Sequence, residues 1–237
     1  MPNVITIGDG VDLEDFNILD SEATGVAFVS YKNDGDRNFI FNLKKSAACC
    51  LNEKNIKEEY FKNCNYLHIT GCSFFNDNMI GSIKKAILTC KKKNIKISFN
   101  PNVRKEILKD NKIINFIKYI VVICNIFLTG EEELKIISGI ENEKEAVKTL
   151  LDCGVEYILV KRGNRGCTLY NKDYSIESDL INVNEIDSTV ASDCFGVTLI
   201  SCLNQGMDIR KALKFANAER AMAVTKKGPI EGNSKTS

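Results

Sequence analysis

The chain has 237 residues, of which 44% are hydrophobic, so it is long enough to bury a full core in one or two domains. Its 32 lysines and arginines almost balance its 31 aspartates and glutamates, which leaves a formal net charge of +1. This balance gives no electrostatic support for binding to nucleic acid or to an anionic membrane surface. The composition therefore favours small molecules as partners.

The cysteines indicate a reducing compartment. The ten cysteines include no C-x-x-C pair and the chain has one histidine, which argues against a Cys/His zinc site. Buried, reduced thiols are typical of cytoplasmic proteins. No run of 18 apolar residues occurs, and the N-terminus lacks the basic and apolar regions of a signal peptide. We therefore expect a cytoplasmic protein.

In chain order, the first expected elements are a short strand over residues 4–7 and a β-hairpin. Residues 24–31 and 37–43 alternate between apolar and polar side chains. The turn signal Asn33-Asp34-Gly35 lies between them. The pattern predicts two antiparallel strands.

From residue 66 onward, predicted strands alternate with predicted helices, and this rhythm indicates an α/β fold with a mostly parallel sheet between two layers of helices. Ligands of such folds bind beyond the carboxyl ends of the strands. The lone histidine, His68, lies inside a predicted strand, so we interpret it as a core residue and not as a catalyst. The predicted strands are Tyr66 to Thr70, Ile95 to Phe99, Ile126 to Leu128 and Tyr157 to Lys161, and the predicted helices are Asp77 to Lys92, Ile113 to Tyr119, Glu131 to Ile137 and Glu141 to Cys153.

The stretch from Asp187 to Phe195 follows an expected strand over residues 181–186 and opens a helix. The backbone amides and the dipole of a helix start can hold a phosphate. Asp193, in the first turn, would stand beside that phosphate and could accept a proton from a hydroxyl. On the local pattern alone, an acid that only stabilises the helix start is the simpler interpretation.

Several segments resemble the ribokinase-like (PfkB) family of carbohydrate kinases. Residues 187–195 (DSTVASDCF) are similar to its signature D-[ST]-T-G-A-G-D-x-F, and residues 215–218 (FANA) and 223–229 (AVTKKGP) continue the pattern. Residues 100–104 (NPNVR) resemble its D-x-N-x-R segment, and residues 128–134 (LTGEEEL) resemble its N-x-x-E segment. The resemblance covers most of residues 10–232.

The resemblance implies a single three-layer domain over residues 1–237, with residues 22–44 as a β lid over the sugar. It also implies that the γ-phosphoryl group of ATP is transferred to a carbohydrate hydroxyl, with Mg²⁺ as the charge neutraliser. The fuller pattern looks closest to kinases of ketoses or 2-keto-3-deoxy sugar acids. Pairing of two chains through the lid, as in relatives, is left open.

The resemblance also assigns roles to individual residues. Two of these assignments have a structural alternative. The substrate residues could belong to a solvated hairpin, and the segment assigned to Mg²⁺ could owe its acids to a capping box of Thr129 and Glu132. The assigned residues are Asp193 as catalytic base; Val190, Ala191 and Ser192 as anion hole; Lys161, Gly163, Gly166, Asn217, Lys227 and Gly228 for ATP; Arg104 for phosphate; Arg37, Asn42 and Lys44 for the substrate; Glu133 for Mg²⁺ through water; and Asp187 and Thr189 for a monovalent cation such as K⁺.

The chain departs from the family pattern at several places. Val190 and Ser192 replace glycines, and a β-branched residue at positive φ would be strained by about 1–3 kcal/mol. Glu219 and Arg220 replace small residues beside the nucleotide, which would narrow that pocket or alter the packing of the helix. We expect the sugar-contacting block that relatives carry after the first strand, and the further helix with which they continue, to have no counterpart in this chain. We therefore expect weak or absent turnover, with a non-catalytic nucleotide- or sugar-binding pseudokinase, or a decayed product without a ligand, as alternatives.

Overall fold

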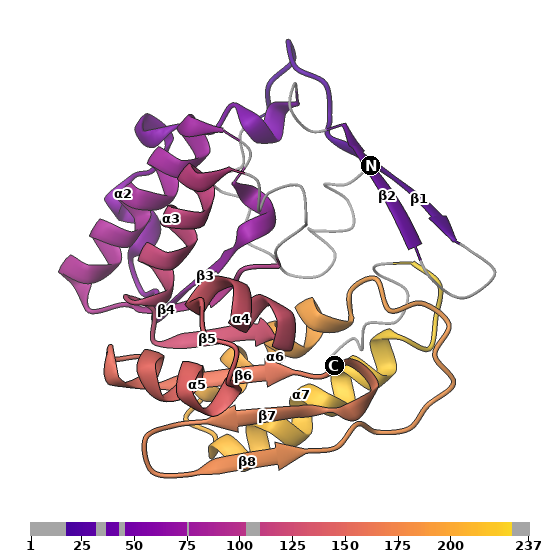
Figure 1. Cartoon of the computed structure of the whole chain (residues 1–237). Coiled ribbons are helices and arrows are strands. Elements are labelled where there is room, and N and C mark those ends of the chain that lie inside the picture. The colour runs from indigo at the N-terminus through magenta and orange to yellow at the C-terminus, as the bar shows by residue number, and fades with distance from the viewer. Residues whose placement is uncertain (1–17, 32–36, 43–45, 75, 103–109, 229–237) are drawn as a thin grey trace. The chain divides into compact units, whose positions relative to one another are not determined.

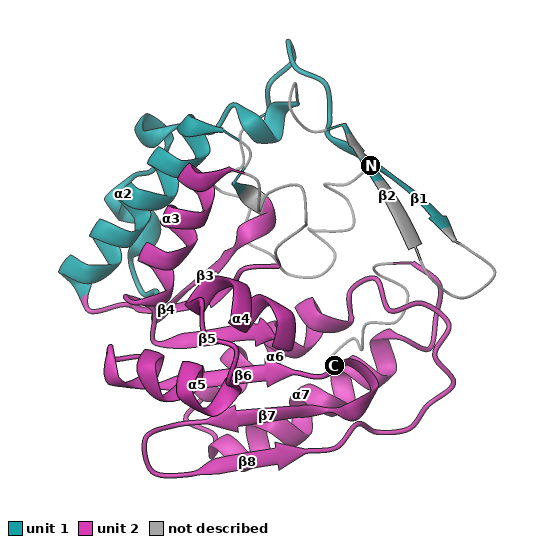
Figure 2. Ribbon diagram, in the orientation of Figure 1, with its two compact units in different colours: residues 1–64, 73–93 teal, residues 65–72, 94–237 magenta. Residues whose placement is uncertain are grey.

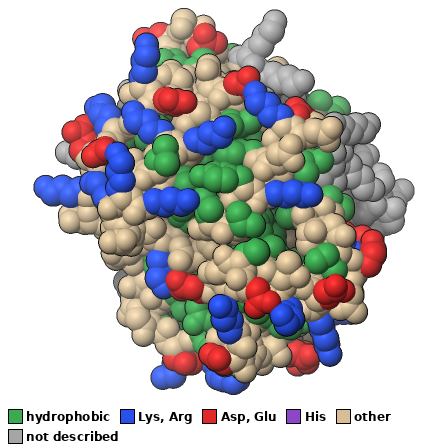
Figure 3. All heavy atoms as spheres, turned by 60° about the vertical axis from the view of Figure 1, so that its left-hand side comes forward, with side chains coloured by type: hydrophobic (Ala, Val, Ile, Leu, Met, Phe, Trp, Pro, Cys, Tyr) green, Lys and Arg blue, Asp and Glu red, His purple; other side chains and the backbone are tan. Residues whose placement is uncertain are grey.

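The computed structural model describes residues 18–31, 37–42, 46–74, 76–102 and 110–228 (Figure 1). The chain divides into two compact units (Figure 2): unit 1 comprises residues 1–64 and 73–93, and unit 2 comprises residues 65–72 and 94–237. The single domain over residues 1–237 stays a prediction. No helix in the described ranges is long and apolar enough to span a membrane. Figure 3 shows acidic and basic side chains interspersed over one face, as the near-zero net charge leads one to expect.

Unit 1 contains the predicted hairpin and one long helix. Strands β1 (Val26–Tyr31) and β2 (Arg37–Asn42) pair antiparallel, with Val26 opposite Asn42, which confirms the hairpin. Helix α2 (Asp77–Lys93) packs against two short 3-10 turns, η2 (Glu53–Asn55) and η3 (Glu58–Phe61). Its Lys85 and Lys93 ammonium groups donate to backbone carbonyls of those turns at 2.8 and 3.0 Å.

Unit 2 is built on a six-stranded sheet in the order β3-β4-β5-β6-β7-β8. The first four strands run parallel and the last two antiparallel, so the predicted mostly parallel sheet is confirmed. Parallel strands end at the same edge, and here they end in Thr70, Asn100, Gly130 and Lys161. The strands are β3 (Tyr66–Thr70), β4 (Lys96–Asn100), β5 (Ile126–Gly130), β6 (Tyr157–Lys161), β7 (Cys167–Tyr170) and β8 (Ser175–Ser178).

Helices cover both faces of this sheet. Figure 1 shows α4 and α5 in front of the strands and α6 and α7 behind them. Local capping explains several starts: Asp110, Asn142 and Asp208 accept backbone amide hydrogen bonds in the first turns of α3, α5 and α7. The helices are α3 (Asn111–Val121), α4 (Glu131–Ser138), α5 (Glu143–Asp152), α6 (Ala191–Asn204) and α7 (Ile209–Ala223).

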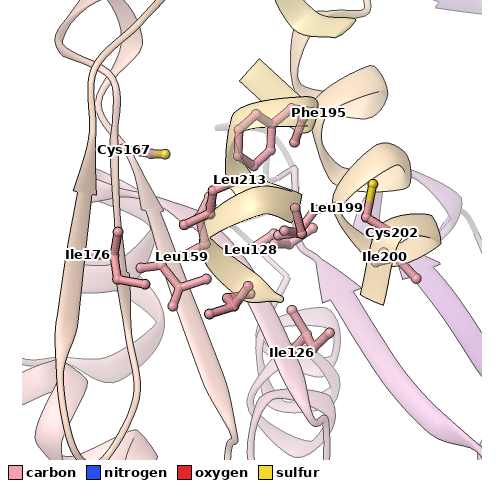
Figure 4. Packing of buried hydrophobic residues seen from close by; sticks show 14 residues of the cluster. Ile126, Leu128, Leu159, Cys167, Ile176, Phe195, Leu199, Ile200, Cys202 and Leu213 are labelled. Carbon is pink, nitrogen blue, oxygen red and sulfur yellow. The ribbon is translucent and has the colours of Figure 1, made fainter. Parts of the chain in front are cut away.

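The main core of unit 2 lies between the sheet and the α6–α7 pair. Leu128, Leu159, Leu169 and Ile176 occupy paired positions on four successive strands. Phe195 and Leu199 of α6 and Leu213 of α7 pack against this row (Figure 4). The spacing of Phe195, Leu199 and Cys202 places these side chains on one helical face, as the sequence predicted. This packing fixes where α6 begins relative to the strand ends.

The prediction of a strand over residues 181–186 is wrong. These residues form no regular element, and Ile181 and Ile186 are 46% and 56% exposed. The Ile186 and Asp187 amides donate to the Val224 carbonyl, at 2.8 and 3.2 Å, so this end of the segment is tied to the end of α7 and not to the sheet. The last strand is β8, which ends at Ser178.

The described residues include all ten cysteines and contain no disulfide bond. Cys64 in unit 1 and Cys153 in unit 2 are exposed, while five others, among them Cys167, are buried.

Candidate active site

The carboxyl ends of the parallel strands bring polar groups together in unit 2. The Lys161 ammonium donates to Asn100 Oδ1 at 3.0 Å, across the end of β5. His68 Nδ1 lies 2.9 Å from Ser98 Oγ. Burial lowers the pKa of His68, and the nearby Lys161 charge lowers it further, so the imidazole stays neutral. This satisfied, half-buried ring matches the interpretation of His68 as a structural residue.

Asp193 lies in the first turn of α6, as predicted. Its side chain is accessible to solvent, yet protein atoms surround its carboxylate closely enough that desolvation raises its pKa, while the Lys161 ammonium acts in the opposite direction. A carboxylate at the edge of a concave surface has both properties. The raised pKa makes it a better proton acceptor than an ordinary aspartate.

The helix start does not have the strained geometry that the missing glycines suggested. Val190 has φ −110°, and no residue from 190 to 192 has a positive φ. The expected strain at Val190 is therefore absent. The amides of Ala191 and Asp193 donate to the carbonyls of Ser188 and Val190, at 3.2 and 3.1 Å.

Asp187 and Thr189 are brought together, as the resemblance implied. Asp187 is 4% exposed, and its Oδ1 accepts hydrogen bonds from the Thr189 amide and hydroxyl. Its Oδ2 accepts from the Gly228 amide at 3.1 Å. This buried carboxylate joins the turn before α6 to the segment after α7.

The capping box predicted for Thr129 and Glu132 is displaced by one residue. Gly130 is the N-cap of α4, and the Glu133 carboxylate accepts its amide at 2.8 Å. Glu133 thus has a structural role at the end of β5. Within the described ranges, no group of three or more His, Cys, Asp or Glu side chains is arranged to hold a metal ion. Mg²⁺ needs no such group, because it is often held by one or two carboxylates with waters and phosphates.

A cavity of about 320 Å³ opens beside the start of α6. Its volume is in the range of small-molecule sites. Gly163 and Gly166, in the loop between β6 and β7, have φ of 58° and 82°, a conformation that suits glycine and lets the backbone approach a ligand. The lining residues are Lys161, Gly163, Asn164, Gly166, Cys167, Leu180, Glu185, Ser188, Ala191, Ser192, Phe195, Asn217 and Arg220.

Asn217 offers a polar group to this cavity. It is 3% exposed, its amide nitrogen donates to Ser178 Oγ at 2.6 Å, and its Oδ1 is buried without a hydrogen-bond partner in the described part of the chain. A buried polar atom without a partner is costly.

Arg220 stands in the wall between this cavity and a second one of about 390 Å³. It pairs with Glu185 at 3.6 Å, and both residues line both cavities. Whether Arg220 narrows a nucleotide pocket stays a prediction. Glu185 was missed because it falls in the segment mistaken for a strand.

The predicted site residues separate into three groups. Asp193, Lys161, Ser192, Asn217 and the loop glycines gather at the α6 start, and Gly228 bonds to Asp187 nearby. Arg37 and Asn42 belong to β2 of unit 1, where Asn42 is exposed. Lys44 and Arg104 lie outside the described residues.

The site also contains a network that the sequence did not reveal. Arg162 donates to Glu143 and Glu131 at 2.5 to 2.8 Å, and Tyr170 donates to Glu143 at 2.6 Å. Arg165 pairs with Glu131 as well. These bonds fasten the glycine loop to the starts of α4 and α5.

A lysine and a glycine loop line the cavity at the strand ends, and a carboxylate lies in the first turn of the adjoining helix, which is where α/β folds bind their ligands. The sequence model of the family described as "pfkB family carbohydrate kinase" matches residues 6–236 of this chain. The chain belongs to this family.

Relatives and solved structures agree with this membership. The chain is 28% identical over 231 residues to "Probable fructokinase-2" of Arabidopsis thaliana, covering 93% of this chain and 70% of that protein. Crystal structures of a "putative Ribokinase II" from E. coli, apo and with ATP and Mg²⁺, match at 38% identity with TM-scores of 0.94 and 0.93, covering 98% of this chain and 75% of theirs. A Vibrio cholerae fructokinase with fructose, ADP and potassium matches at 24% identity and TM-score 0.83, covering 97% and 76%, and this likeness shows the fold alone. The predicted ribokinase-like fold is confirmed.

Proposed function

We propose that this protein is an ATP-dependent kinase that phosphorylates a hydroxyl group of a ketose or a related sugar acid. The observation that carries the proposal is Asp193: a carboxylate with a raised pKa in the first turn of α6, with Lys161 close by at the strand ends. The fructokinases among the relatives favour a ketose. A 2-keto-3-deoxy sugar acid is the alternative substrate.

Residues of unit 2 would hold the nucleotide and its metal. The Asn217 amide would bind the base, the Gly163–Gly166 loop would lie along the nucleotide, and Lys227 and Gly228 would close that side. Arg104 would bind phosphate, Glu133 would hold Mg²⁺ through water, and Asp187 with Thr189 would face K⁺. The choice of ATP and Mg²⁺ as ligands is supported by the E. coli structure that contains both.

The chemistry assigned to the chain is proton removal and charge stabilisation. ATP, when bound, supplies the γ-phosphoryl group. Asp193 takes the proton of the sugar hydroxyl. As it does so, the hydroxyl oxygen bonds to the γ-phosphorus, and the bond between this phosphorus and the ADP oxygen breaks. Residues 190–192, chiefly the Ser192 amide, would hold the charge on the transferred group. Arg37, Asn42 and Lys44 of the lid would contact the sugar.

The test is an ADP-release assay over a panel of ketoses and sugar acids, with the product identified by mass spectrometry. Asp193→Asn should abolish product formation while Mg·ATP still raises the melting temperature. Asp173→Asn, which removes an exposed carboxylate from a turn, is the matched control. Product formation by Asp193→Asn at the wild-type rate would contradict the assignment.

A non-catalytic nucleotide-binding role is the second candidate. It is favoured by the Ala191 and Asp193 amides, which already donate to Ser188 and Val190. Reduced turnover therefore stays a prediction. A melting-temperature shift with Mg·ATP but no product from any sugar would support this candidate, and no shift with any ligand would support a protein without one. Dimerisation through the lid and a cytoplasmic location belong to the proposal as predictions.

A further inference from the structure

Lys161 is placed so that its ammonium reaches over the end of the neighbouring strand. Lys161 ends β6, and its register partner Gly130 ends β5. Paired residues direct their side chains to the same face, so a side chain at position 130 would share the face of Lys161. The Lys161 ammonium extends to Asn100 at the end of β4, 3.0 Å away.

The charge of Lys161 is not cancelled by a close acid. Its hydrogen-bond partner is the neutral amide of Asn100, which is 1% exposed, and Lys161 forms no ion pair within the described residues. Burial lowers the pKa of Lys161, while the more distant Glu133 and Asp193 carboxylates favour its charged form. An ammonium has three donors, and Asn100 accepts from one.

Lys161 is also a lining residue of the cavity, together with Ala191 and Ser192 of the α6 start. An anion held there needs positive charge, and two of the nearby amides, those of Ala191 and Asp193, already donate to carbonyls of the chain. Lys161 is a cation that lines this cavity on the side of the strand ends.

We propose that Lys161 is a further catalytic residue, whose ammonium binds the γ-phosphate of the bound nucleotide and neutralises the charge on the phosphoryl group during transfer, with Asn100 as its positioning residue. This inference rests on the proposed function. The competing interpretation is a purely structural Lys161–Asn100 bond that joins the ends of β4 and β6.

ATP and ADP separate these interpretations, because only ATP carries the γ-phosphate. In Lys161→Met, the affinity for Mg·ATP should fall about 10- to 100-fold, as for loss of a charge-assisted hydrogen bond, while the affinity for Mg·ADP changes less than about 3-fold. Lys161→Arg should restore part of the difference in affinity between Mg·ATP and Mg·ADP. Lys172→Met, at an exposed position, is the matched control for the lost charge.

Asn100→Leu tests the neutral partner with a side chain of similar volume that accepts no hydrogen bond. Without this acceptor the Lys161 ammonium is no longer held in place, so the preference for ATP over ADP should shrink and kcat should fall more than KM rises. A structural bond predicts the opposite pattern, with the ATP preference unchanged and only the melting temperature altered.

The experiment is a calorimetric titration of each variant with Mg·ATP and with Mg·ADP, together with kcat and KM for the wild-type substrate. If wild type prefers ATP and Lys161→Met keeps the same preference, the inference about Lys161 is overturned while the proposed function stands. If neither nucleotide binds wild type, both are overturned. Loss of the preference in Lys161→Met and a smaller preference in Asn100→Leu, with Lys172→Met unchanged, support the inference.

Discussion

The Asp187 carboxylate and the Gly228 amide, 41 positions apart, meet in a hydrogen bond of 3.1 Å that ties the start of α6 to the segment after α7. In Asp187→Asn, the side-chain NH2 group would replace an oxygen that accepts a hydrogen bond, so two donors would face each other. We therefore expect a loss of about 1–3 kcal/mol in the free energy of unfolding. Urea denaturation measures it. Asp173→Asn should stay within about 0.5 kcal/mol of wild type, and an equal loss in both variants would contradict the buried tie.

The two glycines of the β6–β7 loop should respond differently to alanine. A Cβ at Gly166 would lie 2.2 Å from the Ser178 carbonyl oxygen, while a Cβ at Gly163 meets nothing within 4 Å, although both residues have positive φ. We expect Gly163→Ala to cost about 1–2 kcal/mol and Gly166→Ala about 3 kcal/mol or more. Thermal unfolding of both variants measures the difference, and equal costs would exclude a role for the close approach.

The core between the sheet and α6 provides a matched pair on one helix. Leu199 is fully buried and Val197 is 56% exposed. Leu199→Ala should lower the free energy of unfolding by about 2–5 kcal/mol, because it leaves a cavity against Leu128 and Leu159. Val197→Ala should change it by about 0.5 kcal/mol or less. Chemical denaturation of the two variants is the measurement.

Glu143 should make stability depend on pH. The Arg162 guanidinium lowers the pKa of Glu143 below the ordinary value of 4.5. A depressed carboxylate pKa contributes stability that is present above the unfolded pKa and is lost as the pH falls through the folded pKa. Glu143→Gln should therefore be less stable than wild type at neutral pH, by about 1–3 kcal/mol, and the difference should close in acid. Glu177→Gln, at an exposed strand position, is the control, and a difference that persists in acid would refute the electrostatic cause.

Asp193 should set the acid limb of the activity profile. Desolvation raises its pKa above the ordinary 3.8, and a base acts only when it is deprotonated. We expect kcat/KM to rise with pH through an apparent pKa above 3.8 and then to level off. Initial rates at saturating Mg·ATP measure this. An acid limb at or below the ordinary aspartate value would show that the carboxylate is not desolvated in the working enzyme.

The elements from α2 to β6 were predictable because their apolar periodicities are strong and unbroken. Residues 181–186 misled because Ile181, Val183 and Ile186 give a strand-like pattern, while the backbone in fact turns toward Val224. The capping box was displaced because Thr129 with Glu132 and Gly130 with Glu133 have the same spacing, and only the backbone conformation decides between them.

The site was predictable where one motif carries it and hidden where distant segments meet. Asp187, Thr189 and Asp193 lie within seven residues of one another, so a single signature indicates all three. The Lys161–Asn100 bond joins residues 61 positions apart. In the Glu185–Arg220 pair, Glu185 lies in the segment that was wrongly predicted to be a strand. No local pattern encodes such contacts, because they depend on how the sheet and α7 are packed.

The distribution of thiols makes the molecule convenient for optical labelling. Burial raises the pKa of Cys167, in the cavity wall, to about 11, so at neutral pH this thiol reacts poorly with alkylating dyes. Cys64 and Cys153 are the exposed ones, and each belongs to a different compact unit. Alkylating dyes should therefore attach to Cys64 and Cys153 before they attach to Cys167 in the cavity wall.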